Sequence, residues 1–76
     1  MNIENFIKLF AEQFEESDDV NFESTTAFKE LDEWSSIMSL MIISMIKDNY
    51  NATINAEDIN NANTIADLYE LVLSQL

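Results

Sequence analysis

The sequence contains no cysteine and no histidine, and these two absences remove whole classes of chemistry. Without cysteine there is no disulfide, no thiolate metal site and no cysteine nucleophile. Without histidine the chain lacks the commonest metal ligand and the commonest acid or base at neutral pH. Any thiol chemistry that involves this protein must therefore use a thiol supplied by a cofactor.

Glycine and proline are also absent, so no flexible or proline-rich linker divides the chain. There is room for one domain in 76 residues, and we expect a single domain over residues 1–76. A domain of this size buries only about 60% of the surface that its unfolded chain exposes, so a deep enclosed active site is not expected. The length therefore argues against an enzyme.

Positive charge is scarce, because three lysines stand against fifteen acidic residues and the formal net charge is −12. Such a chain repels nucleic acid and anionic lipid, and it is steered toward basic partner surfaces. The apolar fraction of 47% is too high for a disordered acidic tail, so the chain should fold. Neither a signal peptide nor a run of ~18 apolar residues is present, so no membrane span is expected. We expect a cytoplasmic monomer.

A first helix is indicated by apolar residues at helical spacing from Ile3 to Phe14. We expect it to end near Glu16, where the Ser-Asp-Asp of residues 17–19 stops it. A long loop should follow as far as Ser35, and loops of this length in compact domains are usually functional. The side chains expected to pin this loop are Phe22, Phe28 and Leu31, with a short helical turn from Thr26 to Glu30.

The second helix is the most apolar part of the chain, and we expect it to run from about Ser36 to Asn49 with Ser35 or Ser36 as its cap. Its inward stripe is predicted to be Ile42, Ile43, Ile46 and Tyr50. The apolar residues left partly outside the core are then Ile37, Met38, Leu40 and Met41. This excess suggests a docking surface, although the helix could instead be central and mostly buried in a small bundle.

Two further helical segments are predicted beyond the second helix. An asparagine in residues 49–52 can take the left-handed conformation that glycine would otherwise supply. Asn55 can cap a short turn anchored by Ile59, and Thr64 with Asp67 resembles a capping box. The closing helix would carry the stripe Ile65, Leu68, Tyr69, Val72 and Leu76. The predicted fold is all-α: a small four-helix bundle with three longer helices, one short helix and a long loop between the first two.

Ser36 is the best clue to function, because it lies where an acidic, loop-like stretch gives way to the apolar second helix. A serine in the first turn of a helix presents its hydroxyl beside free backbone N–H groups and the positive end of the helix dipole, which favours an attached phosphate. The chain therefore has the features of a carrier of a phosphate-linked group, although Ser36 could be only a helix cap. The nearby Trp34 either covers the edge of the core or contacts partner enzymes.

Two pairs of adjacent acids, Asp32 with Glu33 and Glu57 with Asp58, could be mistaken for metal or acid–base sites. Adjacent residues on a helix do not face each other, and no histidine is available to complete such a site. We therefore predict no catalytic residue and no metal site.

The order of these features resembles that of the acyl carrier proteins, over nearly the whole chain. The Asp-Ser-Leu motif of that family corresponds to the Ser-Ser-Ile of residues 35–37, with Trp34 ahead of it as in specialised members. Residues 54–59 and 64–68 resemble the openings of the family's third and fourth helices.

This resemblance implies that a phosphopantetheinyl transferase moves the 4′-phosphopantetheine arm of coenzyme A onto Ser36. Acyl groups would be carried as thioesters on the thiol of the arm, and the carrier itself would catalyse nothing. The other implied partners are acyl-loading and acyl-transferring enzymes with basic or apolar docking sites. The residues expected to contact partners are Trp34, Ile37, Met38, Leu40 and Met41.

The chain departs from the family pattern at two places. Ser35 replaces the acid before the modified serine, and the second helix has Met38, Met41 and Lys47 where many members have acids. Methionine adapts to irregular surfaces, so docking should depend more on apolar contact and less on ion pairs. We infer a dedicated pathway in preference to general fatty-acid synthesis.

Two other functions remain open. An unmodified acidic helical module could bind a partner through the apolar start of the second helix. An acidic mimic of nucleic acid would rest on charge alone, and the clustered Met and Ile residues of the second helix argue against it.

Self-repulsion among the excess negative charges should weaken so small a core, and added salt screens this repulsion. We therefore expect the melting temperature to rise with sodium chloride concentration, as followed by circular dichroism. A melting temperature that is unchanged by salt would refute this expectation.

Overall fold

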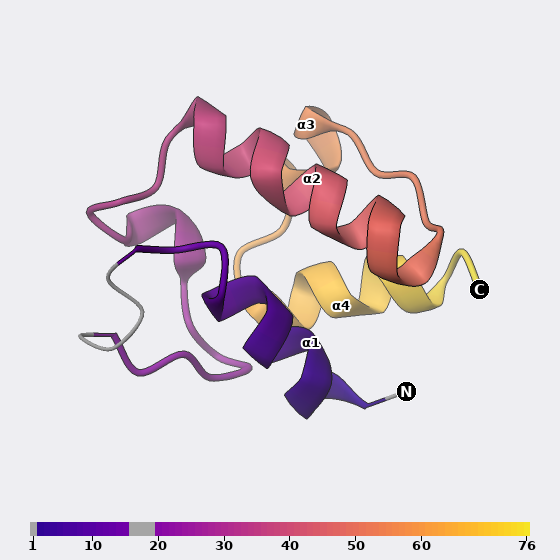
Figure 1. The fold of residues 1–76 in the computed structure, drawn as a ribbon, viewed down its shortest axis with the longest axis horizontal. Coiled ribbons are helices and arrows are strands. Elements are labelled where there is room, and N and C mark those ends of the chain that lie inside the picture. Colours follow the sequence, from indigo (N-terminus) through magenta and orange to yellow (C-terminus); the bar gives the residue numbers. More distant parts are fainter. Residues whose placement is uncertain (1, 16–19) are drawn as a thin grey trace.

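The computed structural model describes residues 2–15 and 20–76, and this part of the chain is all-helical (Figure 1). Its elements are α1 (Ile3–Ala11), a 3-10 turn η2 (Phe28–Glu30), α2 (Ser36–Tyr50), α3 (Ala56–Asn61) and α4 (Ile65–Leu73). Helix α1 packs against both α4 and α2, and α3 packs against α2. Within the described ranges, every helix is too short or too polar to cross a bilayer. The predicted all-α fold with three longer helices and one short helix is confirmed.

The core is formed by side chains from all four helices and from the long loop. The fully buried ones are Phe6, Phe10, Phe28, Ile42, Ile46, Ile59, Ile65, Leu68 and Val72. Phe10 is the central ring of this core, with its centroid 5.4 Å from that of Phe28 and 5.6 Å from that of Phe14. Aromatic rings bury a large area per residue, which matters in a chain this short.

Helix α1 begins at a side-chain cap, since the Asn2 carboxamide oxygen accepts from the backbone N–H of Asn5 at 2.9 Å. The helix ends at Ala11, before the predicted end near Glu16, and a tighter turn follows in which the Phe14 N–H donates to Ala11 at 3.0 Å. Phe14 is buried although it lies outside the helix. Its four-residue spacing from Phe10 therefore matched a helical pattern that the backbone does not continue. Glu16 and the predicted stop at residues 17–19 lie outside the described residues.

The long loop is held against the bundle by both side chains and backbone. Phe28 is fully buried, and Phe22 and Leu31 are partly buried against the core, as predicted. The loop also accepts two hydrogen bonds from the first turn of α4: Ile65 N–H donates to Thr26 at 3.2 Å, and Ala66 N–H donates to Ser24 at 2.9 Å. These bonds satisfy N–H groups that a helix start leaves free. The predicted helical turn at residues 26–30 is present as the shorter η2.

The ends of the later helices follow the predicted polar signals. Asn51 ends α2 in the left-handed conformation, with φ 54° and ψ 31°, in the role that glycine commonly fills. Both α3 and α4 begin with a capping box, made by Asn55 with Asp58 and by Thr64 with Asp67. Capping matters here because helices this short are marginal on propensity alone.

The prediction that Leu76 continues the apolar stripe of the closing helix is wrong. Helix α4 ends at Leu73, and the side chain of Leu76 is 61% exposed. Here the chain is tied to the segment between α2 and α3, because the Gln75 side chain donates to the Thr53 carbonyl at 2.6 Å and accepts from the Thr53 N–H at 2.8 Å. A polar contact, not a further apolar one, therefore fixes the last residues.

The second capping box makes stability depend on pH. Backbone N–H groups of Asn63 and Thr64 donate to the Asp67 carboxylate at 3.0 and 3.1 Å, and this lowers the pKa of Asp67 below its ordinary value of 3.8. The stabilisation is thus present above pH 3.8 and is lost as the pH falls through the folded-state pKa. Asp67→Asn should lower the free energy of unfolding at neutral pH, and the deficit should shrink in acid.

Urea unfolding across a pH series measures this deficit. Asp32→Asn controls for the loss of a negative charge at an exposed position outside a capping box. A deficit for Asp67→Asn that stays constant from neutral to acid pH would contradict the assigned role.

Candidate functional site

The start of α2 is capped by Ser35, which settles the choice that the sequence left open. Ser35 is extended, with φ −158° and ψ 175°, and its hydroxyl oxygen accepts from the backbone N–H of Met38 at 3.3 Å. Ser36 is the first residue of the helix proper, and both serines are exposed. Ser36 is therefore not the cap, and its hydroxyl is left available at the surface.

The surroundings of Ser36 suit an attached phosphate. The first turn of α2 contains no acidic residue, so no carboxylate of that turn opposes a new negative charge. The positive end of the helix dipole lies here and contributes about 0.3–1 kcal/mol at exposed sites. Beside Ser36 an open groove of about 410 Å³ reaches α3, and its lining residues are Trp34, Ser35, Ser36, Ser39, Leu40, Ala56 and Asn60.

The segment before Ser36 is held by contacts with the turn after α1 and with the long loop. The Glu33 carboxylate accepts from the backbone N–H of Glu15 at 2.9 Å. The next residue, Trp34, is half-buried, with its ring stacked near Phe14 at 6.3 Å and edge-on to Phe28 at 5.0 Å between centroids. The expectation that Trp34 covers the edge of the core is confirmed, and its contact with partner enzymes stays a prediction.

The buried face of α2 differs from the predicted stripe. Ile42 and Ile46 are fully buried as expected, but Met38 and Met45 are also buried, at 5% and 4% exposure. The prediction that Met38 lies partly outside the core is therefore wrong. Met38, Ile42, Met45 and Ile46 form one helical stripe at successive offsets of four, three and one residues. The predicted members Ile43 and Tyr50 are only partly buried and lie at the edges of this stripe.

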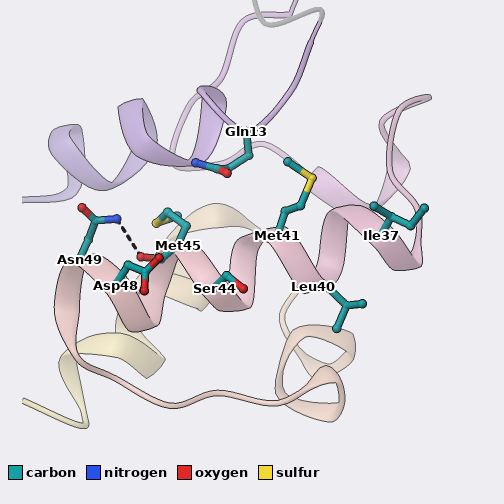
Figure 2. A pocket seen from close by; sticks show the side chains of 8 residues that line it. All are labelled: Gln13, Ile37, Leu40, Met41, Ser44, Met45, Asp48 and Asn49. Carbon is teal, nitrogen blue, oxygen red and sulfur yellow. Dashed lines mark hydrogen bonds between the residues drawn. The ribbon is translucent and has the colours of Figure 1, made fainter.

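Three apolar residues at the start of α2 are exposed: Ile37 at 69%, Leu40 at 63% and Met41 at 38%. We call these residues the apolar patch. They line a second shallow groove, of about 370 Å³, that runs along α2 (Figure 2). Gln13, which follows α1, lies across from Met41, and Asp48 lies at the far end of the groove. Of the patch, Ile37 and Leu40 lie within about one helical turn of Ser36, and Leu40 also lines the groove beside Ser36.

The same helix is almost free of charge in an otherwise acidic protein. Its charged residues are Lys47 and Asp48, both near the C-terminal end and both exposed. Within the described residues, no group of acidic side chains is arranged to hold a metal ion. The arrangement thus offers an accessible hydroxyl beside an apolar surface.

Comparisons with known proteins identify a family that this chain matches. A family model described as the phosphopantetheine attachment site matches residues 5–72. No curated protein and no solved structure matches the chain. The matched range includes all of α2 and α3, most of α1 and α4, and the Ser36 junction.

Proposed function

Because this chain belongs to the phosphopantetheine-attachment family, we propose that Ser36 is the residue to which its 4′-phosphopantetheine arm is attached. Proteins of this family bind the arm covalently and act as non-catalytic carriers. In this proposal residues 1–76 form one carrier domain that works in the cytoplasm, with acyl groups held as thioesters on the terminal thiol of the arm. The chain itself has no cysteine, so the arm would supply the thiol.

The observation that supports Ser36 most strongly is the division of roles between the two serines. Ser35 provides the cap through its bond to the Met38 N–H, which leaves the Ser36 hydroxyl exposed and without a structural task at the cap. In the transfer from coenzyme A, the Ser36 oxygen would form a phosphodiester bond and lose its proton, and adenosine 3′,5′-bisphosphate would leave. A phosphodiester at this position stays in solvent at the positive end of α2, so the fold need not change.

The apolar patch is the proposed docking surface for partner enzymes. A transferase that reaches the Ser36 hydroxyl must also cover Ile37 and Leu40, because both are exposed and within one turn of it. Loading and transferring enzymes would meet the same surface when they take up the arm. Met38 is omitted from this surface because it is buried, whereas Trp34 keeps an exposed portion that a partner could contact.

The nearly neutral α2 further supports a dedicated pathway. Acidic residues elsewhere on the chain would steer basic partners over long range, but the surface next to Ser36 offers mainly apolar contact. An enzyme that docks by ion pairs would find few charged side chains to pair with on this helix. The same patch is also compatible with a second function, an unmodified interaction module.

The modification can be tested by intact mass spectrometry after incubation with coenzyme A and a broad-specificity phosphopantetheinyl transferase. We expect the parent to gain one phosphopantetheine and Ser36→Ala to gain none, because the accepting oxygen is removed. Ser35→Ala is the matched control, since it should lose about 1 kcal/mol of cap stability yet still be modified. Modification of Ser36→Ala would overturn the assignment of the arm to Ser36. No modification of the parent with several transferases would favour the unmodified module.

Docking through the apolar patch can be tested with the double variant Ile37→Ser, Leu40→Ser. We expect the KM for transferase modification to rise roughly tenfold, because a few central residues often carry most of the binding free energy of an interface. Leu73→Ser is the control, because Leu73 is 43% exposed but belongs to α4. An unchanged KM for the double variant would exclude the patch as the docking surface.

A further inference from the structure

The segment that precedes Ser36 is joined to the turn after α1 by neighbouring contacts, and we call the two described below the junction clasp. One contact is the hydrogen bond from the Glu15 N–H to the Glu33 carboxylate, at 2.9 Å. The other is the stack of Trp34 on Phe14, with centroids 6.3 Å apart and an interplanar angle of 26°. Phe14 and Glu15 in the first segment thus contact Trp34 and Glu33 in the second. Glu15 and Glu33 are 18 positions apart in the sequence.

The clasp lies immediately before the helix start. Only Ser35 separates Trp34 from Ser36, so a clasp that fixes Trp34 also limits where the Ser36 hydroxyl can lie. Ser35 caps α2 in an extended conformation, with φ −158° and ψ 175°. Ser35 can keep this conformation only if Trp34, the residue before it, stays in place. Farther along, α2 is held by its buried stripe, which begins at Met38. The clasp and this stripe therefore restrain the junction from its two sides.

The two contacts differ in their effect on the whole fold. Trp34 also meets Phe28 edge-on at 5.0 Å, so loss of its ring would disturb the core. The Glu33 bond is at the surface, where a hydrogen bond adds little to global stability but still restrains the backbone. A carboxylate acceptor makes it stronger than a neutral bond of the same length. Glu33 is therefore the residue at which local positioning can be separated from folding.

We infer that Glu33 and Trp34 are positioning residues for the modification of Ser36: they hold the helix start in the conformation that the transferase binds. This inference rests on the proposed function. When only a fraction of molecules has the competent conformation, apparent affinity falls by that fraction. Loss of the Glu33 bond should therefore raise the KM for modification while kcat stays the same.

The experiment compares Glu33→Ala with Glu33→Gln in the transferase assay, using the full chain and intact mass as the readout. Glutamine keeps a side-chain oxygen that can accept from the Glu15 N–H, whereas alanine does not. We expect Glu33→Ala to raise KM about three- to tenfold at unchanged kcat, and Glu33→Gln to raise it less, because its neutral oxygen keeps a weaker form of the bond. The fluorescence of Trp34, the single tryptophan of the chain, should shift to longer wavelength in Glu33→Ala as its ring becomes more exposed.

A destabilised variant remote from the junction separates positioning from general loss of stability. Thr64→Ala removes the cap of α4, which is bonded to Asp67 at 3.2 Å, and should lower the melting temperature without changing KM. An unchanged KM for Glu33→Ala, or an equal rise for Thr64→Ala, would overturn this inference and leave Ser36 as the carrier serine. A parent chain that accepts no arm would overturn the proposed function and this inference together.

Discussion

The packing of Phe10 is the interaction on which the rest of the structure depends. Its ring contacts Phe6 within α1, Phe14 after the helix, and Phe22 and Phe28 in the long loop. A chain of 76 residues buries too little surface to hold a long loop by many small contacts, so a few large rings must do it. From Phe14 and Phe28 the ring contacts continue to Trp34, next to the helix start, so the core and the candidate site are one connected structure.

Charge and apolar surface are divided between different parts of the molecule. The net charge of −12 acts over long range, whereas the exposed residues of α2 nearest Ser36 include the apolar side chains of Ile37 and Leu40. If the proposed docking surface is correct, this division would make the approach of a partner depend on salt concentration and its final contact depend on apolar shape complementarity. An uncharged cap at Ser35 is tolerated because the serine hydroxyl accepts the capping hydrogen bond that an aspartate carboxylate could accept.

Polar side chains mark the ends of several helices, and one of them takes the conformational role of glycine. Asn51 adopts the left-handed conformation at the end of α2, and capping boxes at Asn55 and Thr64 begin the two later helices. These local signals could be predicted from the sequence because each depends on residues within four positions of one another. The loop carbonyls of Ser24 and Thr26 that accept from α4 could not, because they come from a segment with no periodic pattern.

The sequence by itself determined the all-helical class, the order of the helices, the caps of the later helices and the serine at the start of α2. Helical spacing and capping chemistry are local properties, so they can be recognised without knowing which face meets the core. Only the tertiary structure decided that α1 stops at Ala11, that Met38 is buried and that Ser35 takes the cap. When a helix carries more apolar residues than one face can bury, the elements that pack against the helix decide which of these residues are buried. Local periodicity cannot supply that information, because Phe10, Phe28 and Trp34 come together from distant parts of the chain.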